Sequence, residues 1–337
     1  MRKVALVCSL CLALVACGGG TKKPQASKSP PPPPRSSLTG LVVADAKVLK
    51  RPVIAVKVEN SIDARPQSGL DDADVVYEEI AEGGITRFIA LYQSQDAPVI
   101  GPVRSARLVD PNVLKQFRAI LAFSGAHPIV QDALARSGIK LLSYLDYPEA
   151  YYRSSARQAP HNLFTSLKRL YKFAKGALPP TNIFRFAEQP PVLPSPSASP
   201  SPALARGSHV QINFSEQQTS LWRYSAAKDV YLRWQGSSRH LLTGGSQVSA
   251  RNVLLLYVKV KMTNILDPAG NPSPDVEVIG SGRLALFRNG IEVKGTWKRA
   301  AVDDQTTMTD VTGAPVSLAP GITWIELVPT DVVVTSG

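Results

Sequence analysis

Arginines recur in short loops of this 337-residue sequence, each near a glycine or proline that restricts the backbone. They are Arg65, Arg87, Arg104, Arg107 and Arg157. A guanidinium presents five donors in a rigid fork that suits phosphate or carboxylate oxygens, and a neighbouring glycine lets the backbone approach a ligand closely. Because these loops lie near the ends of predicted strands, where α/β folds usually place ligands, we expect an anion-binding site built from arginines.

Other polar residues near the same strand ends complete the predicted ligand-binding set. The full set is Asn60, Arg65, Gln67, Ser68, Glu78, Glu82, Thr86, Arg87, Arg104, Ser105, Arg107, Arg157, His161 and Asn162. The acids Asp74, Glu78, Glu79 and Glu82 are candidates for orienting the arginines or for holding a divalent cation. The competing interpretation is an internal network of arginine–carboxylate pairs that fixes the register of strands and loops. Spacing alone favours neither interpretation.

Motifs of several common enzyme classes are missing from the sequence. It contains no Walker loop, no dinucleotide-binding fingerprint and no Gly-x-Ser-x-Gly elbow. The four histidines have no zinc-ligand spacing. His161, next to Asn162, is the best candidate for a working histidine, although a structural hydrogen-bonding role is the more common use of such a residue. The sequence therefore assigns no catalytic residue, and a divalent cation is the one cofactor it leaves open.

The N-terminus has the pattern of an exported lipoprotein. Arg2 and Lys3 precede an apolar run over residues 4–16, which is too short to span a bilayer and typical of a signal peptide. The residues Leu-Val-Ala before Cys17 resemble the bacterial lipobox, in which this cysteine receives a palmitate-type lipid. We expect a signal peptide at 1–16 and anchoring through Cys17 to the outer face of the cell membrane. An ordinary signal peptide cut near the same place is the alternative.

Composition and charge restrict the partners. The formal net charge is +12, and removal of the two positive charges of Arg2 and Lys3 leaves +10. An exported basic protein meets phospholipid head groups and anionic polymers of the envelope. No lysine-rich or aromatic-interleaved basic motif supports nucleic-acid binding. The other two cysteines, Cys8 and Cys11, leave with the signal segment, so we expect no disulfide.

Low-complexity stretches divide the remaining chain. Residues 17–40 are rich in glycine, proline and serine and predict a tether, and residues 188–206 predict a proline- and serine-rich interdomain linker, with a surface insertion as the alternative. We expect an α+β protein of two domains: an α/β domain with a mixed sheet at 41–187, then a predominantly antiparallel β domain at 207–337. In the first domain, helices are predicted at 109–120, 129–137 and 166–175.

Several long motifs resemble the YerB-like bacterial lipoproteins, a family with a two-part region of unknown function. The motifs of the first part lie at 60–70, 73–78, 82–87, 101–107 and 159–162, and those of the second part at 231–233, 252–253, 295–298 and 321–324. The resemblance implies export and two domains but no activity. The family's second part tends to carry a Pro-His-x-Asp-like segment that residues 236–242 lack, which puts any site on that loop in doubt.

Three functions follow as hypotheses. The first is a tethered protein that binds an anionic envelope ligand through the arginines. The second is an enzyme of cell-wall polymer assembly, since its ingredients are broadly similar to those of the LytR-CpsA-Psr phosphotransferases, without a motif match; there Asp74 or Glu78 would help to hold a metal and the arginines would clamp a polyprenyl pyrophosphate. The third is a scaffold that meets a protein partner through its β domain.

Overall fold

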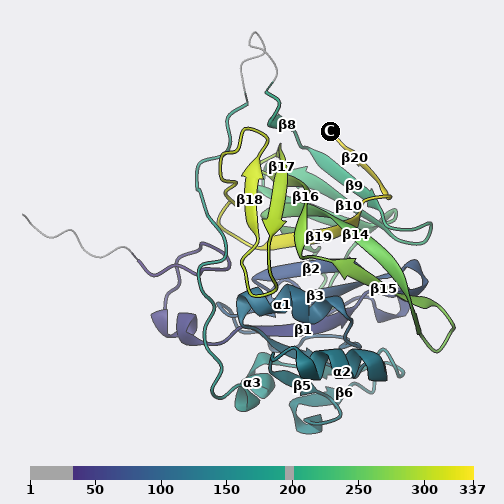
Figure 1. The fold of residues 1–337 in the computed structure, drawn as a ribbon. Helices are drawn as coiled ribbons and strands as arrows, with labels where there is room; N and C mark the ends of the chain where they lie inside the picture. Colours follow the sequence, from purple (N-terminus) through teal and green to yellow (C-terminus); the bar gives the residue numbers. More distant parts are fainter. Residues whose placement is uncertain (1–32, 194–200) are drawn as a thin grey trace, which may run out of the picture. The chain divides into compact units, whose positions relative to one another are not determined.

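One mixed sheet takes strands from both ends of the sequence (Figure 1). The computed structural model describes residues 33–193 and 201–337. The strands of this sheet are β1 Ile54–Glu59, β2 Val75–Ile80, β3 Thr86–Tyr92, β4 Ile120–Phe123, β5 Leu141–Ser143, β8 Leu204–Arg206, β14 Asn252–Leu266, β15 Pro272–Glu277, β16 Gly280–Arg288, β17 Ile291–Arg299, β18 Thr307–Asp310 and β19 Thr323–Pro329. Within the described residues their order is β18-β17-β16-β14-β19-β2-β3-β1-β4-β5, with β15 beside β14 and β8 beside β17.

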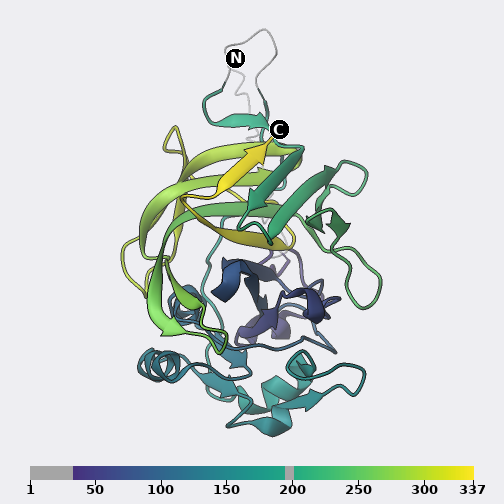
Figure 2. The ribbon, with the colours of Figure 1, turned by 90° about the vertical axis from the view of Figure 1, so that its right-hand side faces the viewer.

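Two smaller sheets complete the β structure of the described residues. Their strands are β6 Tyr151–Arg153, β7 Leu163–Thr165, β9 His209–Asn213, β10 Thr219–Ser225, β11 Val230–Gln235, β12 Ser238–Arg239, β13 Ser249–Ala250 and β20 Val333–Ser336. β6 and β7 pair with each other, while the others follow the order β12-β11-β10-β9-β20, with β13 beside β11. In the central sheet, β14 is 15 residues long and turns back through β15 as a hairpin (Figures 1 and 2).

The helices are short. They are α1 Val109–Leu114, α2 Pro128–Arg136 and α3 Leu167–Leu170, and 3-10 turns lie at Ala46–Lys50, Ile62–Ala64, Glu82–Gly84, Lys115–Phe117, Pro148–Ala150 and Tyr171–Phe173. Of the helices in the described ranges, none has the length and apolar character needed to cross a membrane. The helices predicted at 109–120 and 166–175 are therefore longer than those observed. With so few helical residues, the protein is mostly β.

The N-terminal region contributes the mixed part of the sheet. β1 pairs antiparallel with β3 and parallel with β4, and β4 pairs parallel with β5. The predicted mixed sheet is therefore present. β4 begins at Ile120, the last residue of the helix predicted at 109–120. α1 ends earlier, at Leu114, because the chain must reverse to place this apolar strand beside β1.

The C-terminal region completes that same sheet. β19 lies between β14 and β2 and is parallel to both, with Thr323 opposite Val75 and Glu326 opposite Glu78. All residues of β1, β2, β3 and β19 are buried, as expected for central strands covered on both faces. The two regions predicted from the sequence thus share one sheet, and residues 34–337 group as one unit.

The predicted tether and linker are partly structured. Leu38 and Thr39 are fully buried, and Gly321 donates its backbone N–H to the Thr39 carbonyl at 2.8 Å. The folded part therefore begins before residue 40. Arg288 donates to the carbonyls of Ala187 and Gln189, and β8 pairs with β17. Both described flanks of the 188–206 stretch are attached to the sheet, whereas Cys17 and residues 194–200 lie outside the described residues.

The shared sheet predicts that the N-terminal region does not fold alone. A fragment of residues 34–187 lacks β19, so β2 keeps an unpaired edge and the apolar side chains around it lose their cover. We expect the fragment to show no cooperative thermal transition by circular dichroism, whereas residues 34–337 unfold in one transition. A sharp transition of the fragment with dispersed amide resonances would contradict the shared core.

Candidate functional site

The predicted ligand-binding residues separate into three groups in space. Asn60, Gln67, Glu78 and Thr86 belong to a buried network, Glu82, Arg87 and Arg107 form a buried acid–base cluster, and Arg65, Ser68, Arg104, Ser105, Arg157, His161 and Asn162 lie at or near the surface. The arginines that were predicted to form one binding site therefore lie in two separate groups.

The buried network centres on an ion pair between the two sequence regions. Arg233 on β11 donates from Nη2 to both carboxylate oxygens of Glu78 on β2, at 2.9 and 2.7 Å, and both side chains are fully buried. The guanidinium also lies 5.3 Å from the centre of the Trp324 ring. Glu78 accepts further hydrogen bonds from Thr86 Oγ1 at 2.6 Å and from Trp324 Nε1 at 3.3 Å. Each buried charge thus has several partners, as burial requires.

A relay of hydrogen bonds extends from Arg233 to the loop after β1. Arg233 Nη1 lies 2.6 Å from His240 Nδ1, and His240 Nε2 lies 2.8 Å from Gln67 Oε1. Because arginine only donates, Nδ1 accepts and the ring proton is on Nε2. Burial, followed by the charges of Arg233 and Arg65, lowers the pKa of His240 well below its ordinary value, so the ring is neutral. Gln67 in turn donates to Asn60 Oδ1 at 3.1 Å.

A second carboxyl group completes the network. Glu326 Oε1 on β19 accepts from Trp222 Nε1 at 2.7 Å and from Ser220 Oγ at 3.0 Å, while Oε2 has no hydrogen-bond partner among the described residues. Burial, followed by the nearby Glu78 charge, raises the pKa of Glu326 well above its ordinary value of 4.5. Glu326 therefore keeps its proton to a higher pH than an ordinary glutamate does.

The buried acid–base cluster has a structural role. Glu82 pairs with Arg107 and lies 3.5 Å from Arg87 Nη1, and it accepts a hydrogen bond from Ser273 on β15. The side chains of Arg87 and Arg107 are only 7% and 11% exposed. For these two arginines the internal-network interpretation fits the geometry.

A second buried ion cluster, made of Lys57, Glu79 and Asp110, was not predicted from the sequence. Lys57 on β1 donates to Glu79 on β2 and, at 2.8 Å, to Asp110 in α1, and all three side chains are fully buried. Burial raises the pKa of Glu79 to about 7, although Lys57 opposes the shift. The cluster joins α1 to the two strands beneath it.

The surface residues gather around Glu59, the last residue of β1. The Glu59 carboxylate lies 3.0 Å from Arg104 Nε and 2.9 Å from His161 Nδ1, and it is itself only 2% exposed. The side chains of Arg104 and His161 are 26% and 23% exposed. A buried carboxylate thus lies against two partly exposed groups. Within residues 33–193 and 201–337, the Nη atoms of Arg104 and Nε2 of His161 make no hydrogen bond.

Two further arginines near Glu59 bind neutral groups. Arg157 donates to the carbonyls of Ala64 and Pro66, and Arg65 donates to the carbonyl of Asn60 at 2.8 Å. Burial, followed by the charge of Arg233, lowers the pKa of Arg65 to about 10, which leaves it charged. We call Arg65, Arg104, Arg157, His161 and Glu59 the edge cluster. Its arginines exceed its carboxylates, so it carries a net positive charge.

The edge cluster lies at the carboxyl ends of the parallel strands β1 and β4. Ser124, which follows β4, donates its N–H to the Arg104 carbonyl at 3.0 Å, and Gly125 accepts from the N–H of Ala106 at 3.0 Å. Ser105, between them, is partly exposed and its side chain makes no hydrogen bond within the described residues. This is the position at which open α/β sheets bind ligands.

The remaining predicted residues support these loops. Asn162 accepts from Arg153 Nη1 at 2.6 Å, and Ser68 donates to Thr243 Oγ1 at 3.0 Å. The first bond joins the residue before β7 to the end of β6, and the second joins two loops.

The acids proposed for a divalent cation have other partners. Asp74 accepts from Ser94 and from the N–H of Gln93, and Glu78 binds Arg233. In residues 33–193 and 201–337 no group of three or more His, Cys, Asp or Glu side chains is placed to hold a metal ion. The geometry therefore offers these acids no metal site.

The predicted ligand-binding set lacked the residues that form ion pairs and hydrogen bonds with its members. Glu59, Arg233, His240 and Glu326 were not in the predicted set. One signal was present for Glu326, because a lone acid in the apolar strand Thr323–Pro329 needs a buried partner. The loop at 236–242, which departs from the family pattern, still contributes His240 to the network.

Comparisons with known proteins cover both regions. Models of the N- and C-terminal domains of a family described as a protein of unknown function (DUF3048) match residues 38–179 and 210–325. The chain is 31% identical over 337 residues to "Putative lipoprotein YerB" of Bacillus subtilis (strain 168), across 98% of this chain and 96% of that protein. A crystal structure of the YerB protein from Bacillus subtilis matches with a TM-score of 0.75 and 27% identity, over 90% of this chain and 100% of that one.

The raised pKa of Glu326 predicts a specific pH dependence of stability. The folded state keeps a proton that the unfolded chain releases near pH 4.5, so this group lowers the free energy of unfolding as the pH rises above that value. Glu326→Gln keeps an acceptor for Trp222 and Ser220 without the charge. We expect the variant to gain stability relative to the wild type as the pH rises, by up to about 1.4 kcal/mol per pH unit.

Chemical denaturation of both proteins between pH 5 and 8 measures this difference. Glu188→Gln, at an exposed acid, is the matched control and leaves the pH profile unchanged. Parallel profiles of wild type and Glu326→Gln would contradict a protonated Glu326.

Proposed function

Because this chain belongs to the DUF3048 family, as the resemblance to YerB-like lipoproteins predicted, we propose that it is a lipid-anchored envelope protein that binds an anionic ligand at the edge cluster. Its anchor is the lipid on Cys17, and its folded part faces the extracytoplasmic side of the cell membrane. The family match carries the lipoprotein part of the proposal, and the geometry around Glu59 carries the ligand part.

The observation that carries the ligand part is the incomplete pairing of Arg104. Its Nε lies 3.0 Å from Glu59 Oε1 as an ion pair without a hydrogen bond, both Nη atoms lack a hydrogen bond within the described residues, and the side chain is 26% exposed. Because Glu59 is buried, it holds the guanidinium from one side and leaves the other side to solvent. Such a preorganised fork suits a phosphate or carboxylate group.

The other members of the edge cluster support the same ligand class. Arg65 and Arg157 bind only neutral partners, and their positive charge remains available to attract an anion over longer distances. His161 offers Nε2 as a hydrogen-bond donor or acceptor beside Arg104. Arg87 and Arg107, which the sequence hypothesis included, are buried against Glu82 and support the loops instead.

The pairing of Glu59 with His161 favours a second candidate function, the cell-wall polymer enzyme. A carboxylate that orients a histidine through Nδ1 leaves Nε2 as a general base or acid, and the adjacent Arg104 would stabilise charge on a pyrophosphate. Any divalent cation in this version arrives with the pyrophosphate, because Asp74 and Glu78 are engaged elsewhere. Turnover in the presence of magnesium separates this candidate from binding alone.

Titration calorimetry with a short-chain polyprenyl pyrophosphate, with and without magnesium, tests the proposal. Arg104→Lys keeps a positive charge beside the buried Glu59 but removes the exposed fork. We expect binding to weaken by about ten- to a hundredfold with little change in the melting temperature, since one charge-assisted hydrogen bond contributes about 1.5–3 kcal/mol.

Arg107→Gln is the matched control for the buried arginines. It leaves Glu82 with only the more distant Arg87, so we expect a loss of about 3 kcal/mol in the free energy of unfolding. Binding by the surviving folded fraction stays the same. If Arg104→Lys loses stability and binding in parallel, or binds as the wild type does, the edge cluster is structural and the proposal fails.

A further inference from the structure

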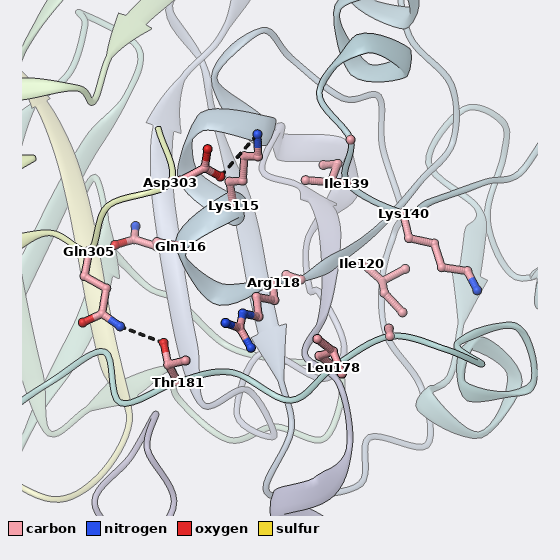
Figure 3. Close-up of a pocket in the computed structure, with 13 residues that line it drawn as sticks. Lys115, Gln116, Arg118, Ile120, Ile139, Lys140, Leu178, Thr181, Asp303 and Gln305 are labelled. Carbon is pink, nitrogen blue, oxygen red and sulfur yellow. Dashed lines mark hydrogen bonds and ion pairs between the residues drawn. The ribbon is translucent and has the colours of Figure 1, made fainter. Parts of the chain in front are cut away.

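A second positively charged concavity lies at the opposite ends of β4 and β5 from the edge cluster. It has a volume of about 460 Å³, and its lining includes Lys115, Arg118, Lys140 and Leu178 (Figure 3). Ile120, the first residue of β4, forms part of its wall. The site is thus at the amino ends of the parallel strands and shares no residue with the edge cluster.

Arg118 has a backbone conformation that favours glycine. Its φ is +52°, and it terminates the helical segment that begins with α1. Its N–H donates to the Lys115 carbonyl at 3.1 Å, and the N–H of Ala119 donates to the Leu114 carbonyl at 3.4 Å. These two bonds define a Schellman motif, whose left-handed position is usually glycine because a Cβ is unfavourable there. Arg118 thus occupies a backbone position that glycine would adopt with less strain.

The Arg118 side chain lines the cavity without a partner. It makes no hydrogen bond or ion pair with residues 33–193 or 201–337, and Figure 3 shows it between Gln116 and Leu178. Lys115 is paired with Asp303 at 3.3 Å. Lys140 extends on the other side of Ile120 in the same view, and its ammonium donates to a backbone carbonyl at 3.0 Å. Two cations of the lining, Arg118 and Lys140, therefore have no acidic partner in the part of the chain that the structure describes.

The remaining lining combines apolar and hydrogen-bonding groups. Ile120, Ile139 and Leu178 present aliphatic side chains, and Leu178 is 61% exposed. Gln305 donates to Thr181 Oγ1 at 2.7 Å, next to Arg118 in Figure 3. A cavity lined by an exposed guanidinium without a partner among the described residues, and by aliphatic side chains, suits a ligand with a charged head and an apolar tail.

We propose that this cavity binds an anionic amphiphile. Its phosphate-type head is held by the Arg118 fork, with Thr181 and Gln305 as hydrogen-bonding neighbours, and its apolar chain lies against Ile139 and Leu178. Lys115 and Lys140 add positive potential at the two ends. Because the site is separate from the edge cluster, this proposal does not depend on the proposed function.

The test uses the full chain in an uncharged detergent and hexyl phosphate as the probe, measured by titration calorimetry against blank micelles. Arg118→Gly removes the guanidinium and places the preferred residue at the left-handed position. We expect at least tenfold weaker binding together with an equal or higher melting temperature. Arg206→Gln, at an exposed arginine of β8 outside both proposed sites, is the matched control and binds hexyl phosphate as the wild type does.

Three results would overturn the proposal. Wild type that gives no heat with hexyl phosphate has no such site. Arg118→Gly that binds as the wild type does, or an equal loss of binding in Arg206→Gln, places the binding elsewhere. If inorganic phosphate binds as tightly as hexyl phosphate, the apolar chain contributes nothing to binding, and the ligand is a free phosphate rather than an amphiphile.

Discussion

The buried ion pair between Glu78 and Arg233 is the constraint on which the rest of the structure depends. Two opposite charges from sequence regions far apart are both fully removed from water. Neither is tolerated in that position without the other, because an isolated buried charge costs several kcal/mol. The pair therefore ties the sheet that contains β11 to the central sheet at β2. Burial and the Glu78 charge also raise the pKa of Glu326, which lies opposite Glu78 on β19.

This constraint explains why the two regions share one core. β19 returns from the end of the chain to lie beside β2, and its arrival brings Trp324 against the Arg233 guanidinium. The C-terminal region is thus part of the support for the loops that carry the edge cluster. A ligand at that cluster would contact groups whose positions depend on both regions.

Local sequence patterns predicted much of the N-terminal region and the loops that hold the polar residues. Runs of β-branched residues marked the central strands, and glycine or proline marked the turns between them. The partners of the polar residues were not predictable, because they depend on contacts between distant segments. Arg104 and Arg107 stand three positions apart in one motif. One reaches the surface beside Glu59, and the other is buried against Glu82, which also accepts a hydrogen bond from Ser273 of β15.

A double-mutant cycle at the central pair tests the account most directly. The free energy of unfolding of Glu78→Gln, Arg233→Gln and the double variant is measured by chemical denaturation at pH 7. Each single change is expected to cost about 3–5 kcal/mol of the free energy of unfolding, because the remaining charge is buried alone. The double variant, which has neither charge, is expected to be more stable than either single variant. Additive costs, with the double variant the least stable of the three, would contradict the central role of the pair.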